Sequence, residues 1–315
     1  MSFIVSVGSY LPDGILTNDD LAEIVDTSDE WIYSRTGIKS RHIARQETVE
    51  DMAVFAAQDA LKKANLKADQ IGLIIGATLG ANEITPSLGC SIAKRIGANC
   101  PAFDVNAACS GGLYALEIAK SMHKYNPVLI VASEKLTNYT NWKDRSTCIL
   151  FGDGAGAVIV ADDGIAEILN INLTASPDDN CSLSVDGVNH TDEMGRPAHS
   201  YIKMEGQAVY KFATSTMTKE LNKLLEENNL STQDISSYIL HQANYRIISA
   251  IAKKLDVPIE KFYSNIHHTA NTSCASVFIA LDEFLTNNSM NTDELMVLGA
   301  FGGGFTTGCG ILKWK

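Results

Sequence analysis

The amino-acid sequence predicts a layered α/β fold built from two similar halves. Helical and strand-like patterns alternate along the chain, which is typical of largely parallel sheets covered by helices. The same series of elements occurs twice in the same order. At 315 residues, the chain is also long enough for about two domains. These observations favour two tightly packed halves, residues 1–165 and 166–315, without a low-complexity linker between them.

The first half shows the series helix, strand, helix, strand, helix, strand. Its first helix is predicted by an apolar stripe at helical spacing, made of Val49, Ala53, Phe55, Ala56, Ala60 and Ala64. Polar residues follow, and residues 71–75 then form an apolar run of the length of a buried strand. Residues 92–96 resemble a helix, whereas residues 103–105 and 128–132 resemble strands.

The second half repeats this series. A second apolar stripe is made of Val209, Phe212, Ala213, Met217, Leu221, Leu224 and Leu225. A polar break and a predicted strand at residues 235–239 follow it. Three more segments match in order: 92–96 with 251–255, 109–117 with 274–282, and 128–132 with 295–299. Generic α/β alternation also produces some matches, but the shared order favours a duplication.

Composition and charge exclude several classes of protein. Hydrophobic residues are 45% of the chain and charged residues 20%, which rules out global disorder. The net charge of −12 argues against nucleic acid or an anionic membrane as the main partner. The start of the chain lacks the basic and apolar pattern of a signal peptide. The uncharged run at residues 295–312 holds six glycines, so we expect two buried strands around a glycine turn instead of a membrane helix.

The seven cysteines are an odd number and include no CxxC pair. A disulfide framework or a zinc site is therefore not expected, and a reducing cytoplasm is the favoured location. One of the cysteines is then free to act as a reagent.

Cys109 is the first candidate nucleophile. It follows a predicted strand and precedes Gly111-Gly112, which permit a sharp turn, and a predicted helix that starts near Leu113. A thiol at a helix N-terminus has a lowered pKa and reacts more readily as a thiolate. The alternative is a small buried side chain without a chemical role.

Two further polar positions follow strands in the second half. His241 lies at the end of a predicted strand, where α/β folds commonly bind ligands, and can exchange or donate a proton near neutral pH. Asn271 precedes an apolar helix. The alternatives are a structural histidine and a helix cap. His267-His268 lacks a nearby acidic ligand in sequence, so no metal site is predicted.

Several segments together form a pattern far more specific than any one of them. They are residues 27–38, 107–111, 150–157, 204–206, 241–244, 271–273 and 300–305. Over essentially the whole chain they resemble the thiolase superfamily of condensing enzymes, and within it the 3-oxoacyl-[acyl-carrier-protein] synthase III family. The resemblance implies a five-layered αβαβα sandwich of two duplicated halves and a homodimer.

The resemblance also implies a catalytic triad of Cys109, His241 and Asn271. Cys109 would attack an acyl-CoA, because a thiolate is both a good nucleophile and a good leaving group. His241 and Asn271 would donate hydrogen bonds to the enolate formed when malonyl-carrier protein loses CO₂. The backbone N–H groups of Cys109 and Gly303 would form a second oxyanion hole. No permanently bound cofactor is implied, since the substrates are a CoA thioester and phosphopantetheine-linked malonate.

The resemblance also implies which residues bind CoA and the carrier protein. Trp31 and Arg145 would sandwich the adenine of CoA, with Arg35 nearby, and Asn244 would bind the pantetheine arm. The acidic carrier protein would dock on basic residues of the second half, Lys211, Arg246, Lys253 and Lys254. Without the resemblance, we would interpret these cations as a helix face that is exposed to solvent.

Some positions depart from the family pattern. Ala270 replaces the glycine that usually precedes the catalytic asparagine, and His267-His268 are unusual there. Thr85 stands where many relatives place a bulky aromatic residue, which leaves the primer's length open. Cys274 is expected to be core packing. The glycines at Gly152-Asp-Gly-Ala-Gly156 lack the lysine of a phosphate loop and suggest a structural turn.

The sequence therefore predicts a cytoplasmic, homodimeric condensing enzyme that starts fatty acid synthesis from an acyl-CoA and malonyl-carrier protein. The alternatives are a relative that makes a specialised product (an alkylquinolone, an alkylresorcinol or a polyketide starter) and a non-decarboxylating acyltransferase with the same triad. A biosynthetic thiolase is disfavoured because the surroundings of Cys309 do not match its second catalytic cysteine.

Overall fold

The computed structural model describes residues 1–187, 190–192, 194–196 and 198–315. Within these residues, one ten-stranded sheet has the order β12-β11-β13-β14-β8-β1-β7-β6-β4-β5. The order has an internal symmetry, because the five strands of each half follow one another in the same relative sequence. The two sets meet only at β1 and β8, through the pairs Phe3–Glu167 and Ile4–Ala166.

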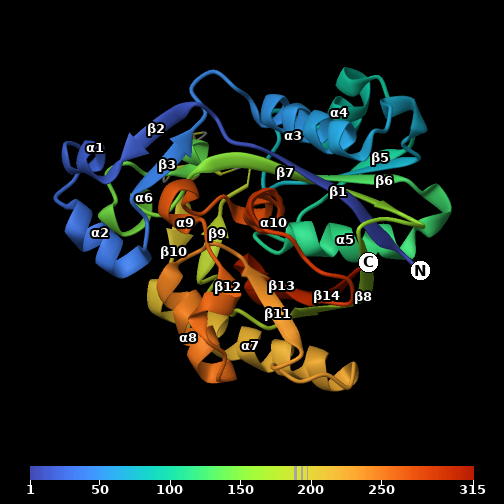
Figure 1. The fold of residues 1–315 in the computed structure, drawn as a ribbon. Coiled ribbons are helices and arrows are strands. Elements are labelled where there is room, and N and C mark those ends of the chain that lie inside the picture. Colours follow the sequence, from blue (N-terminus) through green and yellow to red (C-terminus); the bar gives the residue numbers. More distant parts are fainter. Residues whose placement is uncertain (188–189, 193, 197) are drawn as a thin grey trace.

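The first half matches the predicted alternation of helices and strands (Figure 1). Its elements are β1 (Phe3–Tyr10), α3 (Val49–Ala64), β4 (Leu73–Ala77), α4 (Leu88–Ile96), β5 (Ala102–Val105), α5 (Gly111–Ser121), β6 (Val128–Lys135) and β7 (Asp153–Ala161). The second half repeats them as β8 (Ala166–Ala175), α7 (Gly206–Glu227), β11 (Ile235–Leu240), α8 (Tyr245–Leu255), β12 (Phe262–Tyr263), α10 (Ser276–Asn287), β13 (Leu295–Gly302) and β14 (Thr306–Trp314). The boundary that we propose between residues 165 and 166 lies at the first residue of β8.

Five layers result from this arrangement. Each half contributes five strands of the large sheet, and we treat these two sets as two sheet layers. Helices α3 and α4 cover the outer face of the first layer, and α7 and α8 cover the outer face of the second. Helices α5 and α10 lie between the two layers (Figure 1). The middle layer is the largest hydrophobic core, and it includes Leu113 and Leu116 of α5 and Phe278 of α10. Because both sheets pack on these two helices, residues of both halves stabilise the same core.

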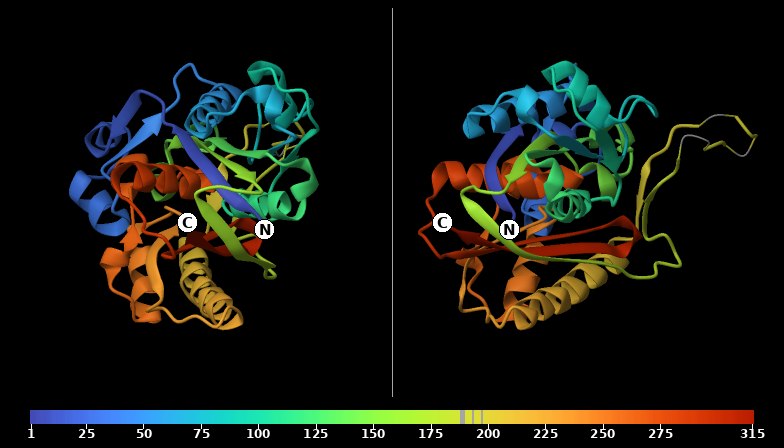
Figure 2. Two further views of the ribbon diagram at one scale, coloured as in Figure 1. Left: turned by 45° about the vertical axis from the view of Figure 1, so that its right-hand side comes forward. Right: turned by 90° about the vertical axis from the view of Figure 1, so that its right-hand side faces the viewer.

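Smaller elements surround one end of the sandwich. They include β2 (Gly14–Thr17), β3 (Ser40–Ile43), α1 (Asn18–Ala22), α2 (Asp29–Thr36), α6 (Arg145–Cys148) and α9 (Ile266–Thr269). The segment between β8 and α7, which we call the arm, extends away from the body of the molecule (Figure 2). It carries a two-stranded sheet of β9 (Leu183–Val185) and β10 (Ile202–Met204). No helix in the described part of the chain is both long and apolar enough to cross a membrane.

The sheets differ from the prediction of largely parallel strands. In each half three strands are parallel, but β7 runs antiparallel to β6 and to β1, and β14 runs antiparallel to β13 and to β8. The chain turns back directly after β6 and after β13, because no helix of more than four residues separates β6 from β7, or β13 from β14. Parallel neighbours would need a longer crossover connection. The uncharged run at 295–312 does form two buried strands around a glycine turn, as predicted.

The turn predicted at Gly152-Asp-Gly-Ala-Gly156 is wrong in detail, because Gly154 and Gly156 lie inside β7. Gly8 likewise lies inside a strand, β1. Close packing explains these glycines, because a Cβ on Gly8 would lie 2.3 Å from the backbone nitrogen of Ala60. Gly111 and Gly112 are the first residues of α5, which starts earlier than expected.

Candidate active site

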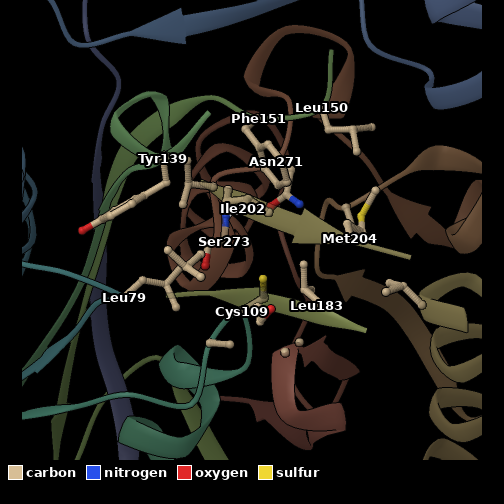
Figure 3. A pocket seen from close by; sticks show the side chains of 18 of the residues that line it. Leu79, Cys109, Tyr139, Leu150, Phe151, Leu183, Ile202, Met204, Asn271 and Ser273 are labelled. Carbon is tan, nitrogen blue, oxygen red and sulfur yellow. Dashed lines mark hydrogen bonds between the residues drawn. The ribbon is translucent and has the colours of Figure 1, made fainter. Parts of the chain in front are cut away.

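A cavity of about 1570 Å³ lies where the two halves meet the surrounding elements. Cys109, His241 and Asn271 all line it, although they come from distant parts of the chain. The structure therefore brings together the three side chains that the sequence singles out. Figure 3 shows Cys109 and Asn271 directed into the same space from opposite sides.

Cys109 lies between β5 and α5, directly before Ser110, the residue at the N-cap position of the helix. The helix N-terminus that the sequence predicts is thus present, but the thiol is buried, with 9% of its residue surface exposed. Burial raises the pKa of the Cys109 thiol to about 12, which outweighs the lowering effect of the Ser273 hydroxyl. The prediction of a lowered pKa is therefore wrong, and the group is a neutral thiol at pH 7.

His241 directly follows β11 and is almost completely buried. Burial lowers its pKa to about 3, so the imidazole is neutral at pH 7. Its Nδ1 lies 2.5 Å from Ser276 Oγ, which also accepts a hydrogen bond from the backbone N–H of Gln242. The Ser276 hydroxyl is satisfied when it donates its proton to Nδ1, and this leaves the proton of the imidazole on Nε2. His241 can then act as a hydrogen-bond donor.

Asn271 is oriented by its neighbours. Its Oδ1 accepts a hydrogen bond of 2.8 Å from the backbone N–H of Ser273. Its own backbone N–H donates to Leu150, and its carbonyl accepts from Gly152. Because the carboxamide oxygen is occupied, the NH₂ group is left to donate toward the cavity. Two neutral donors, from Asn271 and His241, thus face the space beside the sulfur.

The backbone around Gly302 is very close to the nucleophile. A Cβ on Gly302 would lie 2.6 Å from the backbone nitrogen of Cys109, so only glycine fits. Gly303, the residue expected in the second oxyanion hole, also lines the cavity. A Cβ on Gly303 would lie 2.9 Å from the carbonyl oxygen of Leu183. Gly302 is thus the glycine that packs against the backbone of Cys109, and a role of Gly303 in the second oxyanion hole stays a proposal.

Of the expected CoA-binding residues, Arg35 and Asn244 line the cavity, and Trp31 and Arg145 lie beside Arg35. The guanidinium groups of Arg35 and Arg145 lie 4.9 and 4.8 Å from the ring centre of Trp31. An adenine between Trp31 and Arg145 would need about 7 Å, twice an ordinary contact distance of about 3.5 Å. Arg145 would therefore have to move outward for such a sandwich. Asn244 lines the cavity and caps α8, where its Oδ1 accepts from the N–H of Arg246 at 2.8 Å.

The expected docking cations lie on the adjacent helices α7 and α8. Lys211, Arg246 and Lys253 are exposed, and Arg246 also lines the cavity. Lys254 differs, because its Nζ donates to the carbonyl oxygen of Thr214 at 3.1 Å. Its ammonium group is thus engaged within the protein, which leaves the other three as the stronger docking candidates.

The cavity wall contains apolar residues to which the sequence analysis gave no role. They are Leu79, Tyr139, Leu150, Phe151, Leu183, Ile202 and Met204 (Figure 3). Leu183, Ile202 and Met204 come from the arm, so its inner strands β9 and β10 form part of the cavity wall. Thr85 lies on the exposed loop that precedes α4.

The structure shows the backbone conformation and the contacts of the positions that depart from the family pattern. Ala270 has φ 55° and ψ −156°, a conformation that suits glycine, although its side chain is fully buried. His268 contacts Glu283 at 3.2 Å and His267 at 3.2 Å. Cys274 is buried and donates to Glu134 and to the carbonyl oxygen of Ala77. Ser276 is the positioning residue that the sequence analysis missed, because its link to His241 exists only in three dimensions.

Comparisons with known proteins agree with this architecture. Two family profiles match, "3-Oxoacyl-[acyl-carrier-protein (ACP)] synthase III" at residues 103–177 and its C-terminal counterpart at residues 225–314. The chain is 44% identical to the beta-ketoacyl-[acyl-carrier-protein] synthase III of Xanthomonas campestris, over 99% of this chain and 98% of that protein.

Solved structures show the same similarity. The crystal structure of 3-oxoacyl-[acyl-carrier-protein] synthase III from Aquifex aeolicus has a TM-score of 0.92 and 42% identity, and both chains are covered completely. A priming beta-ketosynthase from the R1128 polyketide pathway has a TM-score of 0.92 and 31% identity, over 100% of this chain and 96% of that one. The thiolase-like fold and the condensing site agree with these full-length matches: the chain belongs to the 3-oxoacyl-[acyl-carrier-protein] synthase III family and is an acyltransferase of the condensing type.

Proposed function

We propose that this protein joins an acyl-CoA primer to malonyl-acyl carrier protein with loss of CO₂, and so starts a fatty acid chain. The proposal is carried by one observation: a single cavity is lined by Cys109 and by two neutral hydrogen-bond donors, His241 and Asn271. A thiol alone would support simple acyl transfer. The two donors add the stabilisation of an enolate, which decarboxylation requires.

In the first half-reaction, the Cys109 sulfur attacks the thioester carbonyl of the acyl-CoA. The carbonyl oxygen becomes negative and accepts hydrogen bonds from the backbone N–H groups of Cys109 and Gly303. The intermediate then expels CoA and leaves the acyl group on the sulfur. Trp31, Arg35, Arg145 and Asn244 are the residues that we propose to hold CoA and its pantetheine arm.

In the second half-reaction, malonyl-carrier protein enters the same cavity. His241 and Asn271 donate hydrogen bonds to the thioester oxygen, so that the C–C bond to the carboxylate can break and release CO₂. The resulting carbanion attacks the acyl group on Cys109 and forms the 3-oxoacyl product. These steps use only side chains and backbone groups of the protein, so we propose that no resident cofactor takes part.

The carrier protein is proposed to dock on α7 and α8, through Lys211, Arg246 and Lys253. The net charge of −12 makes this local group of cations notable, because an acidic carrier would otherwise be repelled. A reducing compartment, the cytoplasm, suits an enzyme that depends on a free thiol.

We also propose a homodimer. The edge strand β5 is four residues long and, among the described residues, is paired only with β4. Ile84, in the loop before α4, is 81% exposed and also lines the cavity. Covering this edge with a second copy would bury both features. Light scattering of the purified protein measures the mass, and a monomer would contradict the proposal.

Intact-protein mass spectrometry with a panel of acyl-CoAs from two to ten carbons tests the activity. We expect one added acyl group on the wild type and none on Cys109→Ala. The same panel measures which primer the apolar wall accepts. If no acyl-CoA modifies the wild type, the CoA-primed reaction is wrong.

Release of CO₂ from malonyl-carrier protein separates condensation from simple acyl transfer. His241→Ala and Asn271→Ala should still become acylated on Cys109 but lose at least about 100-fold in decarboxylation, the usual cost of one oxyanion donor. An enzyme that accepts acyl groups but never consumes malonyl thioester would be a non-condensing acyltransferase.

A further inference from the structure

Two loops meet at the candidate nucleophile, and a pair of hydroxyl groups joins them. We call residues 107–110, which contain Cys109 and precede α5, the nucleophile loop. We call residues 302–306, at the turn between β13 and β14, the glycine loop. The Oγ atom of Ser110 lies 2.6 Å from the Oγ1 atom of Thr306. This hydroxyl pair therefore joins two segments that are 196 residues apart in the chain.

Both hydroxyls also lie close to backbone carbonyl groups. Ser110 Oγ is 2.8 Å from the carbonyl oxygen of Ala107. Thr306 Oγ1 is 3.1 Å from the same oxygen and 3.2 Å from the carbonyl oxygen of Gly303. Two hydroxyl oxygens 2.6 Å apart need a proton between them, so one hydroxyl donates to the other and the remaining proton goes to a carbonyl group. In each arrangement a hydrogen bond crosses between the two loops.

The Ser110 side chain is committed to this link. Ser110 stands at the N-cap position of α5, where a serine side chain commonly accepts a hydrogen bond from the helix backbone. It makes no such bond here. Ser110 is completely buried and is not part of the cavity wall, whereas Thr306 lines the cavity. Any effect of the Ser110 hydroxyl on a bound substrate therefore acts through the loops.

The two loops are closely packed and strained where they meet. A Cβ on Gly302 would lie 2.6 Å from the backbone nitrogen of Cys109, so the two backbones are in direct contact. Ala108 in the nucleophile loop and Phe305 in the glycine loop both have φ 47°, which is unfavourable for a residue with a side chain. Strained backbone keeps its conformation only where the surroundings hold it. The hydroxyl pair is a contact that holds both loops at once.

We propose that Ser110 and Thr306 are positioning residues, whose hydrogen bond keeps the backbone N–H groups of Cys109 and Gly303 at the separation that one oxyanion needs. Each loop supplies one of these N–H groups, so a change in the spacing of the loops moves the two donors relative to each other. Donors stabilise an oxyanion most when they are fixed in place before the charge develops. This inference rests on the second oxyanion hole of the proposed function and adds the residues that set its width.

Thr306→Val removes one hydroxyl and keeps the shape of the side chain. The oxyanion forms on an acyl-CoA and equally on p-nitrophenyl acetate, which needs no CoA site. With this ester, the Cys109 sulfur bonds to the carbonyl carbon, nitrophenolate leaves, and the thiol proton passes to water. We expect Thr306→Val to slow acylation of Cys109 by both reagents about 10- to 100-fold, as for a displaced or lost oxyanion donor. Thr306→Ser, which retains the hydroxyl, should restore most of the rate.

Two other reactions should keep their wild-type rates in Thr306→Val. Alkylation of Cys109 by iodoacetamide displaces iodide from a saturated carbon and forms no oxyanion. Release of CO₂ from malonyl-carrier protein depends on the enolate donors His241 and Asn271. Mass spectrometry of the peptide that contains Cys109 follows acylation and alkylation, because Cys90 and Cys181 are exposed and also react. Equal slowing of acylation, alkylation and CO₂ release would mean a general structural defect and would overturn the inference.

Ser110→Ala separates positioning from a direct contact between Thr306 and the substrate. In this variant the Thr306 hydroxyl can still donate to the carbonyl group of Ala107, so acylation should be slower than in the wild type but faster than in Thr306→Val. Combined with Thr306→Val, Ser110→Ala should cost nothing further, because Ser110 then reaches only its own loop. A Ser110→Ala variant that acylates at the wild-type rate, or multiplied losses in the double variant, would overturn the inference.

Thr307→Val is the matched control. Thr307 is the next residue of β14, is buried, and also pairs its hydroxyl with another threonine, Thr174, but neither of these residues lines the cavity. Acylation in Thr307→Val should match the wild type, and a loss equal to that of Thr306→Val would contradict the inference. If Thr306→Val does not fold, Ser110→Ala decides by the same readouts. If the ester follows the expected pattern but no acyl-CoA reacts with the wild type, the proposed function fails and the positioning role stands.

Discussion

Four residues next to the candidate active site hold backbone conformations with positive φ. They are Ala108, Ala270, Ser273 and Phe305, with φ between 47° and 55°. Such conformations cost about 1–3 kcal/mol each and persist only where the surroundings enforce them. Ala108 precedes the nucleophile, and Ala270 precedes Asn271. The strain at these positions is thus located where the side chains of the triad have to be aimed.

Ala270→Gly tests this view at the scale of one residue. The ψ of −156° places Ala270 in a region that only glycine occupies freely, so relief of strain should reach about 3 kcal/mol. Loss of a buried methyl group costs about 0.8 kcal/mol, and the flexibility of glycine costs about 0.5–1 kcal/mol. We expect a net gain of about 1 kcal/mol in the free energy of unfolding, measured by denaturant titration.

Ala275→Gly is the control for this prediction. Ala275 is equally buried but has φ −77°, which any residue adopts, so the same change there should destabilise the protein. Destabilisation by both substitutions would mean that the conformation of Ala270 carries little strain.

At the scale of elements, α8 combines two functions. Its first residues lie at the cavity, where Asn244 caps the helix, and its exposed face carries Arg246 and Lys253. We expect Arg246→Glu to reduce kcat/KM for malonyl-carrier protein several-fold at low salt, because charge reversal slows electrostatically steered association. The deficit should shrink as salt increases, since screening weakens the attraction in the wild type. Steady-state kinetics between about 20 and about 500 mM salt, which changes the Debye length about fivefold, measures this effect.

Lys62→Glu on α3 provides the control with the same change in charge. Lys62 is exposed in the layer farthest from α8, so its reversal should affect kcat/KM much less. Equal effects of the two reversals would indicate that only the net charge matters and would remove α8 as the docking surface.

A second prediction concerns the junction between α9 and α10. Burial alone would raise the pKa of Glu283, but hydrogen bonds from His268, Asn265 and Tyr263 outweigh it and lower the pKa to about 2 from the ordinary 4.5. A depressed folded-state pKa stabilises the protein above pH 4.5, and this contribution is lost as the pH falls toward 2. We therefore expect Glu283→Gln to lower Tm by several degrees at pH 7 and by less as the pH approaches 3.

Thermal unfolding at a series of pH values checks this dependence. Glu226→Gln, on the exposed face of α7, serves as a control that should leave Tm nearly unchanged. A loss of stability in Glu283→Gln that is independent of pH would show that packing, and not the carboxylate charge, joins α9 to α10.

At the scale of the whole molecule, the middle layer joins the two halves. Helices α5 and α10 pack on both sheets, and Phe278 is fully buried among them. Removing its ring should cost about 3–5 kcal/mol in the free energy of unfolding. Because the layer is shared, we expect Phe278→Ala to lower the stability of both halves in one calorimetric transition.

Phe55→Ala is the comparison, because Phe55 is 40% exposed on the outer helix α3. Its substitution should lower the free energy of unfolding much less. Two separated transitions in the wild type, or loss of only one of them in Phe278→Ala, would contradict a common core for the halves.

Much of the fold follows from local patterns. The apolar stripes of α3 and α7 and the buried runs of β4 and β11 repeat in the same order, and periodicity alone reveals them. The strands β7 and β14 return antiparallel because they follow β6 and β13 without an intervening long helix. The glycine turn at residues 302–304 indicates this return for β14, but no local pattern indicates it for β7. The turn predicted at Gly156 is wrong because the helix that this glycine contacts, α10, is distant in sequence.

The same division applies to the site. Residue types and motifs were enough to single out Cys109, His241 and Asn271, since thiol, imidazole and carboxamide are the groups that this chemistry needs. Only the folded chain decides their protonation and direction. The Cys109 thiol has a raised pKa because it is buried, and the orientation of His241 depends on Ser276. Burial and hydrogen-bond partners arise from contacts between distant segments, so they are properties of the tertiary structure and cannot be read along the chain.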